Sequence, residues 1–279
     1  MKILITGSKG MLAKEVIRRF HGNEIIAVDI EDLDITNEKI VFDFISNLKP
    51  EYIINCAAYT AVDKAEENYE VCNNVNNIGV KNLALAAKEV DATILHISTD
   101  YVFDGDKNLL EVYDETDVTN PKSVYGVTKR DGEVAIQESG CKYYILRTSW
   151  MFGDGNNFVM TMLNLGKDKD ELNVVNDQFG SPTYSVDLAD IIFKVIEKKV
   201  PFGIYHSTST DYTNWYEFAK NIFELENINC RVNPVSTEQF PRPAKRPKNS
   251  KLSKDKLIKE GIVPPTYLDA LKRYLGTIK

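Results

Sequence analysis

The sequence predicts an α/β protein built on a doubly wound parallel sheet, with a smaller lobe toward the C-terminus. Short apolar runs rich in Ile, Val and Tyr alternate with segments of helical periodicity through the first half of the chain. These runs alternate little between apolar and polar residues, which is typical of strands that helices cover on both faces. The length of 279 residues is enough for a full hydrophobic core, and 43% hydrophobic and 27% charged residues indicate a globular protein.

The elements of the first half can be taken in order. Helices are expected at residues 11–20, where Leu12, Val16 and Phe20 share one face, and at residues 37–48, where Val41 and Phe44 do the same. Strands are expected at residues 2–6, 25–29, 52–57, 93–98 and 143–149. Repeated β-α units of this size require right-handed crossovers and therefore a parallel sheet.

The chain changes character after residue 150. Short strands are expected at residues 172–175 and 203–206, and helices at residues 186–197, 215–225 and 267–275. A stretch rich in Pro, Lys and Arg, residues 241–251, lies between the last two helices. We therefore expect one domain over residues 1–150 and a second lobe over residues 151–279, which can interleave with the first.

Composition and charge exclude several classes of protein. The net charge of −7 argues against a nucleic-acid binder, which needs cations to neutralise phosphates. The cysteines form no C-x-x-C pair and indicate buried thiols in a reducing compartment, and the histidines form no zinc-spaced cluster. No apolar stretch approaches the length of a membrane span, and the N-terminal run is too short for a signal peptide. We expect a cytoplasmic protein with neither membrane nor nucleic-acid partners.

A glycine-rich turn joins the first expected strand to the first expected helix. It reads Gly7-Ser-Lys9-Gly10-Met11-Leu12-Ala13, the pattern G-x-x-G-x-x-A. Gly7 permits a tight turn, Gly10 lets the backbone approach a pyrophosphate at the helix N-terminus, and Ala13 allows close packing of helix on sheet. The pattern alone fits an ordinary β-α turn equally well, but its position between a strand and a helix favours a Rossmann-like dinucleotide site in residues 1–150.

The second expected strand ends at Asp29, about 20 residues after the turn, where a carboxylate receives the adenosine ribose hydroxyls. The same charge repels a 2′-phosphate and therefore favours NADH. Lys9 in the turn and the nearby Arg18 and Arg19 favour a 2′-phosphate instead, so NADPH remains an alternative cofactor. Asp34 and Ile35 follow where the chain can wrap around the adenine. The alternative for Asp29 is an ordinary carboxylate at a strand end.

A tyrosine and a lysine four residues apart, Tyr125 and Lys129, begin a helix after a loop that contains Pro121. Residues at this spacing stand one turn above each other, so the Lys129 ammonium is expected near the phenol. A nearby cation stabilises the phenolate, and we expect it to lower the phenol pKa and make Tyr125 a general acid for a carbonyl that receives hydride. Lys129 can also hold the nicotinamide ribose. The competing interpretation is a solvent-facing pair on an amphipathic helix.

Two strand ends carry further polar or small residues. The fourth strand ends in His96-Ile-Ser98-Thr99-Asp-Tyr101, and the third ends in Asn55-Cys-Ala57-Ala58-Tyr59-Thr60. Ligands bind at the carboxyl edge of a parallel sheet, and small residues such as Ala57 and Ala58 let a cofactor contact the backbone. We expect these strand ends and the helix at Tyr125 to converge on one crevice.

These motifs together resemble the extended short-chain dehydrogenase/reductase superfamily and, within it, the dTDP-4-dehydrorhamnose reductase family. The likeness covers nearly the whole chain. It rests on residues 7–13, 55–66, 98–103, 125–129, 147–150, 156–158, 176–178, 180–183 and 246–250. The runs Thr60-Ala-Val62-Asp-Lys-Ala-Glu66 and Arg147-Thr-Ser-Trp150 are much more specific than the glycine turn.

The resemblance implies an enzyme that uses NAD(P)H to reduce the C4 ketone of dTDP-4-dehydro-L-rhamnose to dTDP-L-rhamnose. It implies that Thr99, Tyr125 and Lys129 form a catalytic triad in which Tyr125 protonates the developing alkoxide and Thr99 hydrogen-bonds that oxygen. It further implies that Thr60, Val62, Tyr101 and Trp150 line the sugar pocket and that Asn157, Phe158, Gln178 and Arg246 meet the nucleotide. The alternatives are a capping Thr60, core positions for Val62 and Trp150, and a solvated Arg246.

Metal binding, assembly and two other functions stay open. Some members of the family carry Mg²⁺ at a dimer interface, and Glu15 matches one such acidic position, so a homodimer and Mg²⁺ are both undecided. Relatives of the fold also serve as non-catalytic NAD(P)-binding regulatory subunits, but such a subunit has no need of the Tyr125 and Lys129 pair. A related nucleotide-sugar reductase, epimerase or dehydratase is the other alternative. Dehydratases usually carry acidic residues after the catalytic threonine, and here only Asp100 follows Thr99.

Overall fold

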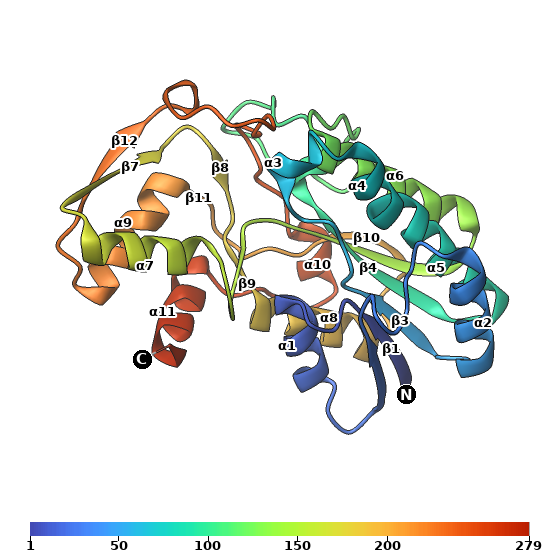
Figure 1. Cartoon of the computed structure of the whole chain (residues 1–279). Coiled ribbons are helices and arrows are strands. Elements are labelled where there is room, and N and C mark those ends of the chain that lie inside the picture. Colours follow the sequence, from blue (N-terminus) through green and yellow to red (C-terminus); the bar gives the residue numbers. More distant parts are fainter. Residues whose placement is uncertain (279) are drawn as a thin grey trace.

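The computed structural model describes residues 1–278 and contains a parallel sheet of six strands in the order β10-β5-β4-β3-β1-β2 (Figure 1). The strands are β1 Lys2–Thr6, β2 Glu24–Val28, β3 Tyr52–Asn55, β4 Thr93–Thr99, β5 Lys142–Thr148 and β10 Gly203–His206. The chain runs outward from β1 to β2 and then returns to β3 on the other side. A crevice at the carboxyl ends of the strands is expected where the order reverses, between β1 and β3. The predicted fold class is confirmed.

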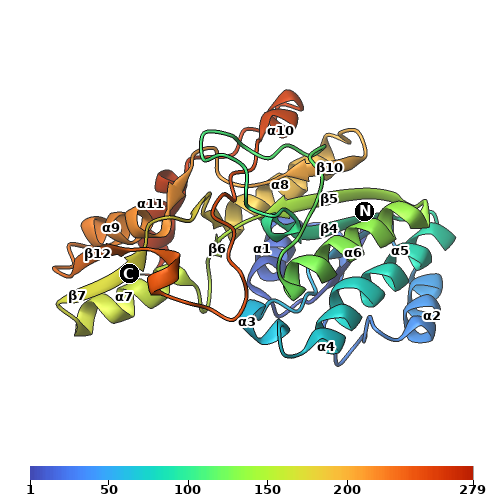
Figure 2. The same cartoon turned by 90° about the horizontal axis from the view of Figure 1, so that it is seen from above.

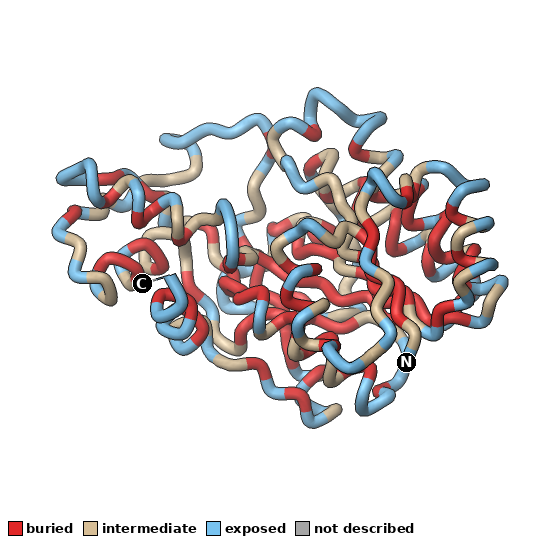
Figure 3. The backbone as a smooth tube through the Cα atoms, turned by 60° about the horizontal axis from the view of Figure 1, so that its bottom comes forward, coloured by how far each residue is buried: buried red, intermediate tan, exposed pale blue. Residues whose placement is uncertain are grey.

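Helices cover both faces of the sheet, which is why its strands are continuous apolar runs. One face packs against α1 (Met11–Arg19) and α8 (Ser185–Glu197), and the other packs against α2 (Glu38–Leu48), α5 (Val80–Glu89) and α6 (Val124–Ser139). Strand residues alternate between the two cores. Ile3 and Ile5 lie with the α1 side, whereas Leu4 lies with the α2 side. Figure 3 shows the buried stretches running along the strands of the sheet.

Each sheet strand predicted from the sequence is present within one or two residues of its expected bounds. Residues 69–89, for which the pattern predicts no element, form α4 (Tyr69–Asn73), a π-helical turn (Asn74–Gly79, η1) and α5. Four asparagines in residues 73–77 make this segment polar for a helix. Asn76 is fully buried there and forms hydrogen bonds through its side chain, so a polar residue occupies a core position that an apolar pattern cannot reveal.

The second lobe has its own core. It contains α7 (Phe158–Asp168), α9 (Trp215–Glu226), α11 (Tyr267–Thr277) and the parallel pair β7 (Glu171–Val175) and β12 (Arg231–Val235). Short two-residue strands complete it: β6 (Met151–Phe152) beside β9 (Thr183–Tyr184), and β8 (Phe179–Gly180) beside β11 (Thr213–Asn214). Figure 2 shows this lobe beside the sheet, with the connecting segments between them.

The two lobes interleave in sequence. Helix α8 and strand β10 follow residue 150, yet α8 packs on α1 and β10 pairs with β5 in the main sheet. Helix α10 (Asp255–Lys259) also lies by this sheet, where Lys256 Nζ donates to the Ile204 carbonyl oxygen at 2.7 Å. Within residues 1–278, no helix combines the length and the apolar character that a bilayer crossing needs.

Candidate active site

A pocket of about 410 Å³ opens at the carboxyl ends of β1, β2 and β3. Most of the residues predicted to bind a dinucleotide line it: Gly7, Lys9, Gly10, Asp29, Asp34, Ile35, Ala57, Ala58 and Tyr59. Met11 and Leu12 follow at the start of α1. The Leu12 side chain is buried in the core and does not line this pocket, so only the backbone of Leu12 could contact a ligand.

The glycine turn has the geometry that its sequence predicts. Gly7 has φ +66°, and a Cβ there would lie 2.8 Å from the backbone of Ala57, so a side chain fits neither the conformation nor the space. The Gly10 N–H donates to the Gly7 carbonyl oxygen at 3.0 Å and closes the turn. The first N–H groups of α1 have no acceptors within the helix and face the turn, which suits an anion such as a pyrophosphate.

Asp29 lies at the end of β2 as predicted, and its carboxylate is fixed by the backbone. It accepts the N–H of Lys9 and the N–H of Ile30, each at 2.9 Å. The Lys9 ammonium pairs with Glu31 at 2.7 Å, and both side chains are well exposed. The acidic and basic groups that decide between a ribose hydroxyl and a 2′-phosphate therefore stand at the same edge of the pocket.

The opposite wall of this pocket is held by buried amides. Asn76 in η1 accepts the Tyr59 N–H at 2.8 Å and donates to the Tyr59 carbonyl oxygen at 3.1 Å. Asn55 at the end of β3 accepts the Ala57 N–H at 3.1 Å. These two asparagines fix the backbone of residues 57–59. No sequence pattern gives Asn76 a role, and its long-range hydrogen bonds to Tyr59 reveal one.

The predicted triad residues come from β4 and α6. Thr99 ends β4 and caps the 3-10 turn η2 (Asp100–Val102), and Tyr125 lies in the first turn of α6, which Ser123 caps. Gly126 lets α6 approach η2, because a Cβ there would overlap the Tyr101 carbonyl oxygen. The rings of Tyr101 and Tyr125 meet edge to face with centroids 5.5 Å apart.

The Thr99 hydroxyl is engaged within the protein. It donates to Asp100 Oδ1 at 3.0 Å and accepts the Tyr101 N–H at 3.2 Å. Asp100 is buried and also accepts the Ser250 hydroxyl at 2.5 Å, and burial raises the pKa of its carboxyl to about 6. The resemblance implied that Thr99 hydrogen-bonds the substrate oxygen. In the structure its proton is directed to Asp100 instead, so Asp100 controls the hydroxyl's orientation.

Lys129 is buried and lies one turn along α6 from Tyr125. Its Nζ bonds the Ile97 carbonyl oxygen at 2.6 Å and lies 3.1 Å from His96 Nε2, and burial lowers its pKa to about 8. Burial raises the pKa of Tyr125 well above its ordinary value, and a hydrogen bond with Thr99 opposes this rise only in part. The expectation that Lys129 lowers the phenol pKa is therefore wrong for this structure, because desolvation dominates at Tyr125.

A buried ion pair fixes α6 against the sheet. Glu133 on α6 accepts Arg147 Nε at 2.9 Å and Nη2 at 2.7 Å, and it also accepts the Ser98 hydroxyl at 2.5 Å. Both charged side chains are about 2–3% exposed. Ser98 and Arg147 stand opposite each other in the register of β4 and β5. The ion pair therefore holds the helix of Tyr125 and Lys129 in a fixed position above the strand that ends at Thr99.

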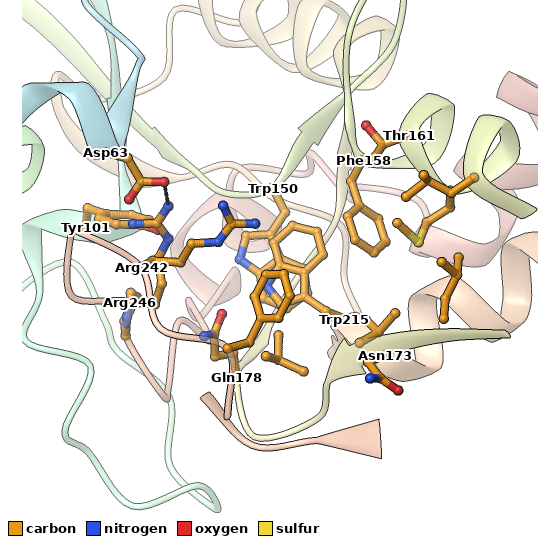
Figure 4. Close-up of a pocket in the computed structure, with 17 residues that line it drawn as sticks. Asp63, Tyr101, Trp150, Phe158, Thr161, Asn173, Gln178, Trp215, Arg242 and Arg246 are labelled. Atoms are coloured by element: carbon orange, nitrogen blue, oxygen red, sulfur yellow. Dashed lines mark hydrogen bonds and ion pairs between the residues drawn. The ribbon is translucent and has the colours of Figure 1, made fainter. Parts of the chain in front are cut away.

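A second pocket, of about 430 Å³, lies between the lobes (Figure 4). Of the residues predicted to bind substrate, Tyr101, Trp150, Phe158, Gln178 and Arg246 line it. The indole of Trp150 stacks on Trp215 with ring centroids 3.7 Å apart and an interplanar angle of 13°. Trp150 has φ +49°, and Gly180 leaves room for its ring. The result is a flat aromatic wall suited to the apolar face of a sugar or to a base.

The opposite side of this pocket is charged. Asp63 at the start of α3 (Val62–Ala65) pairs with Arg246 at 2.8 Å and also accepts the Ala244 N–H at 3.2 Å, and Arg242 lies nearby (Figure 4). Asp63 therefore fastens residues 242–246 of the second lobe to the first. The guanidinium groups of Arg242 and Arg246 face the same cavity as the indole wall, which suits a ligand that combines a ring with an anion.

Besides Thr99, which does not line this pocket, three residues predicted to bind substrate lie elsewhere. Thr60 is exposed, and Val62 is half-buried at the start of α3. Asn157 caps α7: its Oδ1 accepts the Met160 N–H, and its Nδ2 donates to the carbonyl oxygens of Gly153 and Gly155. These hydrogen bonds show that the side chain of Asn157 caps α7 and holds the preceding loop. None of the three lines the pocket that holds Trp150 and Arg246.

Asp63, Arg242 and Trp215 are among the pocket residues to which the sequence patterns give no role. Asp63 lies in the run of residues 60–66 that carries the family resemblance, and Arg242 lies in the basic stretch of residues 241–251. Both segments stand out in the sequence, but neither pattern shows that these two side chains line the pocket. Trp215 begins a predicted helix, and nothing in the sequence indicates that it lines a pocket.

Among residues 1–278, no group of three or more His, Cys, Asp or Glu side chains could hold a metal ion. The Glu15 carboxylate pairs with Arg18 at 2.5 Å.

Comparisons with known proteins agree with this geometry. The sequence pattern of the RmlD substrate binding domain family matches residues 1–279. The dTDP-4-dehydrorhamnose reductase of Aggregatibacter actinomycetemcomitans is 45% identical over 97% of this chain and 97% of its own length. A dTDP-4-dehydrorhamnose reductase structure from Clostridium acetobutylicum is 49% identical with a TM-score of 0.97, covering 100% of this chain and 99% of that one. The enzyme of the same name from Bacillus anthracis, solved in complex with NADP, is 41% identical with a TM-score of 0.95 over 99% of this chain and 100% of that one. The predicted resemblance is confirmed, and the chain belongs to the RmlD substrate binding domain family.

Proposed function

We propose that this protein reduces the C4 ketone of dTDP-4-dehydro-L-rhamnose to dTDP-L-rhamnose with NAD(P)H. The observation that carries the proposal is the position of Tyr125 beside Tyr101, which lines the indole-and-arginine pocket, while the dinucleotide pocket opens at the neighbouring strand ends. The names of the relatives support the same reaction. Reduced nicotinamide supplies the hydride when it is bound.

The residues of this chain supply the proton and the orientation. Tyr125 gives its hydroxyl proton to the oxygen that was the ketone, because a raised phenol pKa keeps that proton in place at neutral pH. Thr99, whose hydroxyl is oriented by Asp100, lies within hydrogen-bond reach of the phenol. Lys129 holds the ribose and returns a proton to Tyr125 afterwards. The buried pair of Glu133 and Arg147 keeps α6 in position throughout.

The second pocket offers aromatic rings for the sugar and cations for the diphosphate of the substrate. Trp150 and Trp215 offer an apolar wall for the deoxysugar, and Arg246 and Arg242 offer cations for the diphosphate. Asp63 shares Arg246 with the ligand and keeps the guanidinium aimed into the pocket.

Replacement of Arg246 by Met is expected to raise the KM for the nucleotide sugar by roughly 10- to 100-fold, because a charge-assisted hydrogen bond contributes about 1.5–3 kcal/mol. The KM for NAD(P)H should stay within about twofold. Steady-state kinetics with each substrate varied in turn measure this separation. Arg231→Met is the control, because Arg231 pairs with Glu171 and neither residue lines the pocket. If the Arg246→Met variant has an unchanged KM for the nucleotide sugar, the diphosphate does not bind at Arg246.

Asp29 is proposed to favour NADH over NADPH by repelling the 2′-phosphate. Asp29→Ala is expected to shift the ratio of kcat/KM values toward NADPH by about tenfold, the equivalent of 1.4 kcal/mol. Because Asp29 also accepts two backbone N–H groups, Asp29→Asn is the matched variant that removes the charge and keeps an acceptor. If neither variant changes the ratio, Asp29 is not at the ribose.

The reaction is tested by the loss of NADH or NADPH absorbance with enzymatically prepared dTDP-4-dehydro-L-rhamnose. We expect turnover with at least one nicotinamide and dTDP-L-rhamnose as the product. Binding of the cofactor without turnover would favour a non-catalytic regulatory subunit instead. Parallel assays with Mg²⁺ and with EDTA decide whether a metal is needed, and sedimentation decides whether the chain forms the homodimer that its resemblance leaves open.

A further inference from the structure

A chain of buried hydrogen bonds crosses the carboxyl edge of the sheet and ends at Lys129. The parallel register sets Thr6, Asn55 and His96 side by side on β1, β3 and β4. The Thr6 hydroxyl donates to Asn55 Oδ1 at 2.6 Å, and Asn55 Nδ2 lies 3.0 Å from His96 Nδ1. His96 Nε2 in turn lies 3.1 Å from Lys129 Nζ. Asn55 and His96 are 0% exposed and Lys129 is 1% exposed, so bulk water does not reach these bonds.

The donors along this chain decide which nitrogen of His96 carries the proton. Asn55 Oδ1 also accepts the backbone N–H of Ala57 at 3.1 Å, which fixes the orientation of the Asn55 amide. Nδ2 therefore faces His96 and donates to Nδ1. Burial lowers the pKa of His96 well below its ordinary value, so the imidazole is neutral. Its single proton must then lie on Nε2.

That proton points at Lys129. An ammonium group has three donors and no lone pair, so it cannot accept a hydrogen bond from His96. The amine form can accept it and still donate to the Ile97 carbonyl oxygen, which lies 2.6 Å from Nζ. We propose that His96, oriented by Asn55, donates its Nε2–H to the amine of Lys129 and thereby makes this lysine a proton carrier rather than a permanent cation.

Three other titratable groups face Lys129. Glu133, one turn further along α6, favours the ammonium. The thiols of Cys72 from α4 and Cys56 after β3 are uncharged, because burial raises the pKa of each. Glu133 is itself bound to Arg147, which limits its effect. Burial favours the amine and outweighs Glu133, so the pKa of Lys129 is lowered to about 8. The hydrogen bond from His96 acts in the same direction as burial.

This inference rests on the proposed function for its role in turnover. Each reduction takes one proton from Tyr125, and the phenolate must recover a proton before the next cycle. The Lys129 ammonium gives that proton and becomes the amine, which His96 then stabilises. Solvent returns a proton to Lys129, and His96 keeps its own proton throughout. The proton gained by the product thus comes from solvent, and His96 acts as a positioning residue.

The state of Lys129 can be measured without turnover, by ¹³C NMR of the full chain labelled at lysine Cε. The Lys129 signal is the one lost in Lys129→Met. His96→Phe keeps a buried ring and removes the Nε2–H, so the midpoint of the Lys129 titration is expected to rise by about half to one pH unit. Lys254 is the internal control, because its pKa is also lowered by burial, to about 7, and it should not move. An unchanged Lys129 midpoint in a folded His96→Phe protein overturns the proposal.

The ring of His96 gives a second measurement, which does not depend on that variant folding. ¹⁵N NMR of the wild-type chain is expected to show His96 protonated on Nε2, and a proton on Nδ1 overturns the proposal. Asn55→Asp replaces the donor by an acceptor, so the proton should move to Nδ1. If the NMR results hold while Lys129→Met turns over like the wild type, the hydrogen-bond chain stands and the proposed catalytic role of Lys129 fails.

Discussion

Tyr125→Phe is expected to lower kcat for the keto sugar by roughly 10²- to 10⁴-fold, which is the usual contribution of a positioned general acid. The variant removes one oxygen and keeps the ring, so the edge-to-face contact with Tyr101 survives. Binding of NAD(P)H and of the nucleotide sugar should therefore change little. Steady-state kinetics, combined with a fluorescence titration of NADPH, separate the loss of chemistry from a loss of binding.

The matched control for this experiment is Tyr69→Phe. Tyr69 begins α4 and is 49% exposed, so its hydroxyl can be removed without touching either pocket. It should behave as the wild type in kcat and in both KM values. A Tyr125→Phe enzyme that retains full kcat would mean that the proton for the product comes from another group.

The second large effect is expected on stability. Arg147→Met should lower the free energy of unfolding by about 3–5 kcal/mol, because it leaves the buried Glu133 carboxylate without its counterion. Chemical denaturation of the variant measures this loss. The double variant Glu133→Leu with Arg147→Met removes both charges and should recover a large part of it, since a well-packed apolar pair can replace a buried ion pair.

Arg231→Met is the comparison for this series. Arg231 forms an ion pair with Glu171, but the two side chains are 74% and 55% exposed. An exposed pair contributes about 0–1 kcal/mol, so the variant should unfold close to the wild type. Equal losses for Arg147→Met and Arg231→Met, or no recovery in the double variant, would show that the pair of Glu133 and Arg147 does not fix α6 as described.

The sheet and the dinucleotide turn could be predicted because their signals are local. A strand covered on both faces must be apolar along its length, and the tight turn from β1 to α1 needs glycine at Gly7, where φ is +66°. The pairing of β7 with β12 and the return of β10 to the main sheet could not be predicted in this way. Both depend on contacts between segments far apart in sequence, which leave no periodic pattern.

The candidate site also combines features with a local sequence signal and features that depend on contacts between distant segments. Tyr125 and Lys129 share one helix, so their spacing singled out the pair, and the polar and small residues at two strand ends were needed to favour it over a solvent-facing pair. The interactions that set their protonation come from elsewhere. His96 on β4 contacts Lys129 Nζ, and burial raises the pKa of Tyr125. The closure of the second pocket by Asp63 and Arg246 joins residues 183 positions apart.

The most direct test of the proposed reaction is the fate of a deuterium label. The wild-type enzyme is given dTDP-4-dehydro-L-rhamnose and a reduced nicotinamide cofactor in which the hydride that leaves the nicotinamide ring is replaced by deuteride. The product is then examined by NMR. We predict one deuterium at C4 of the rhamnose and none elsewhere on the sugar. A product without the label at C4, or a sugar changed in configuration without consumption of the cofactor, would contradict direct hydride transfer to the ketone.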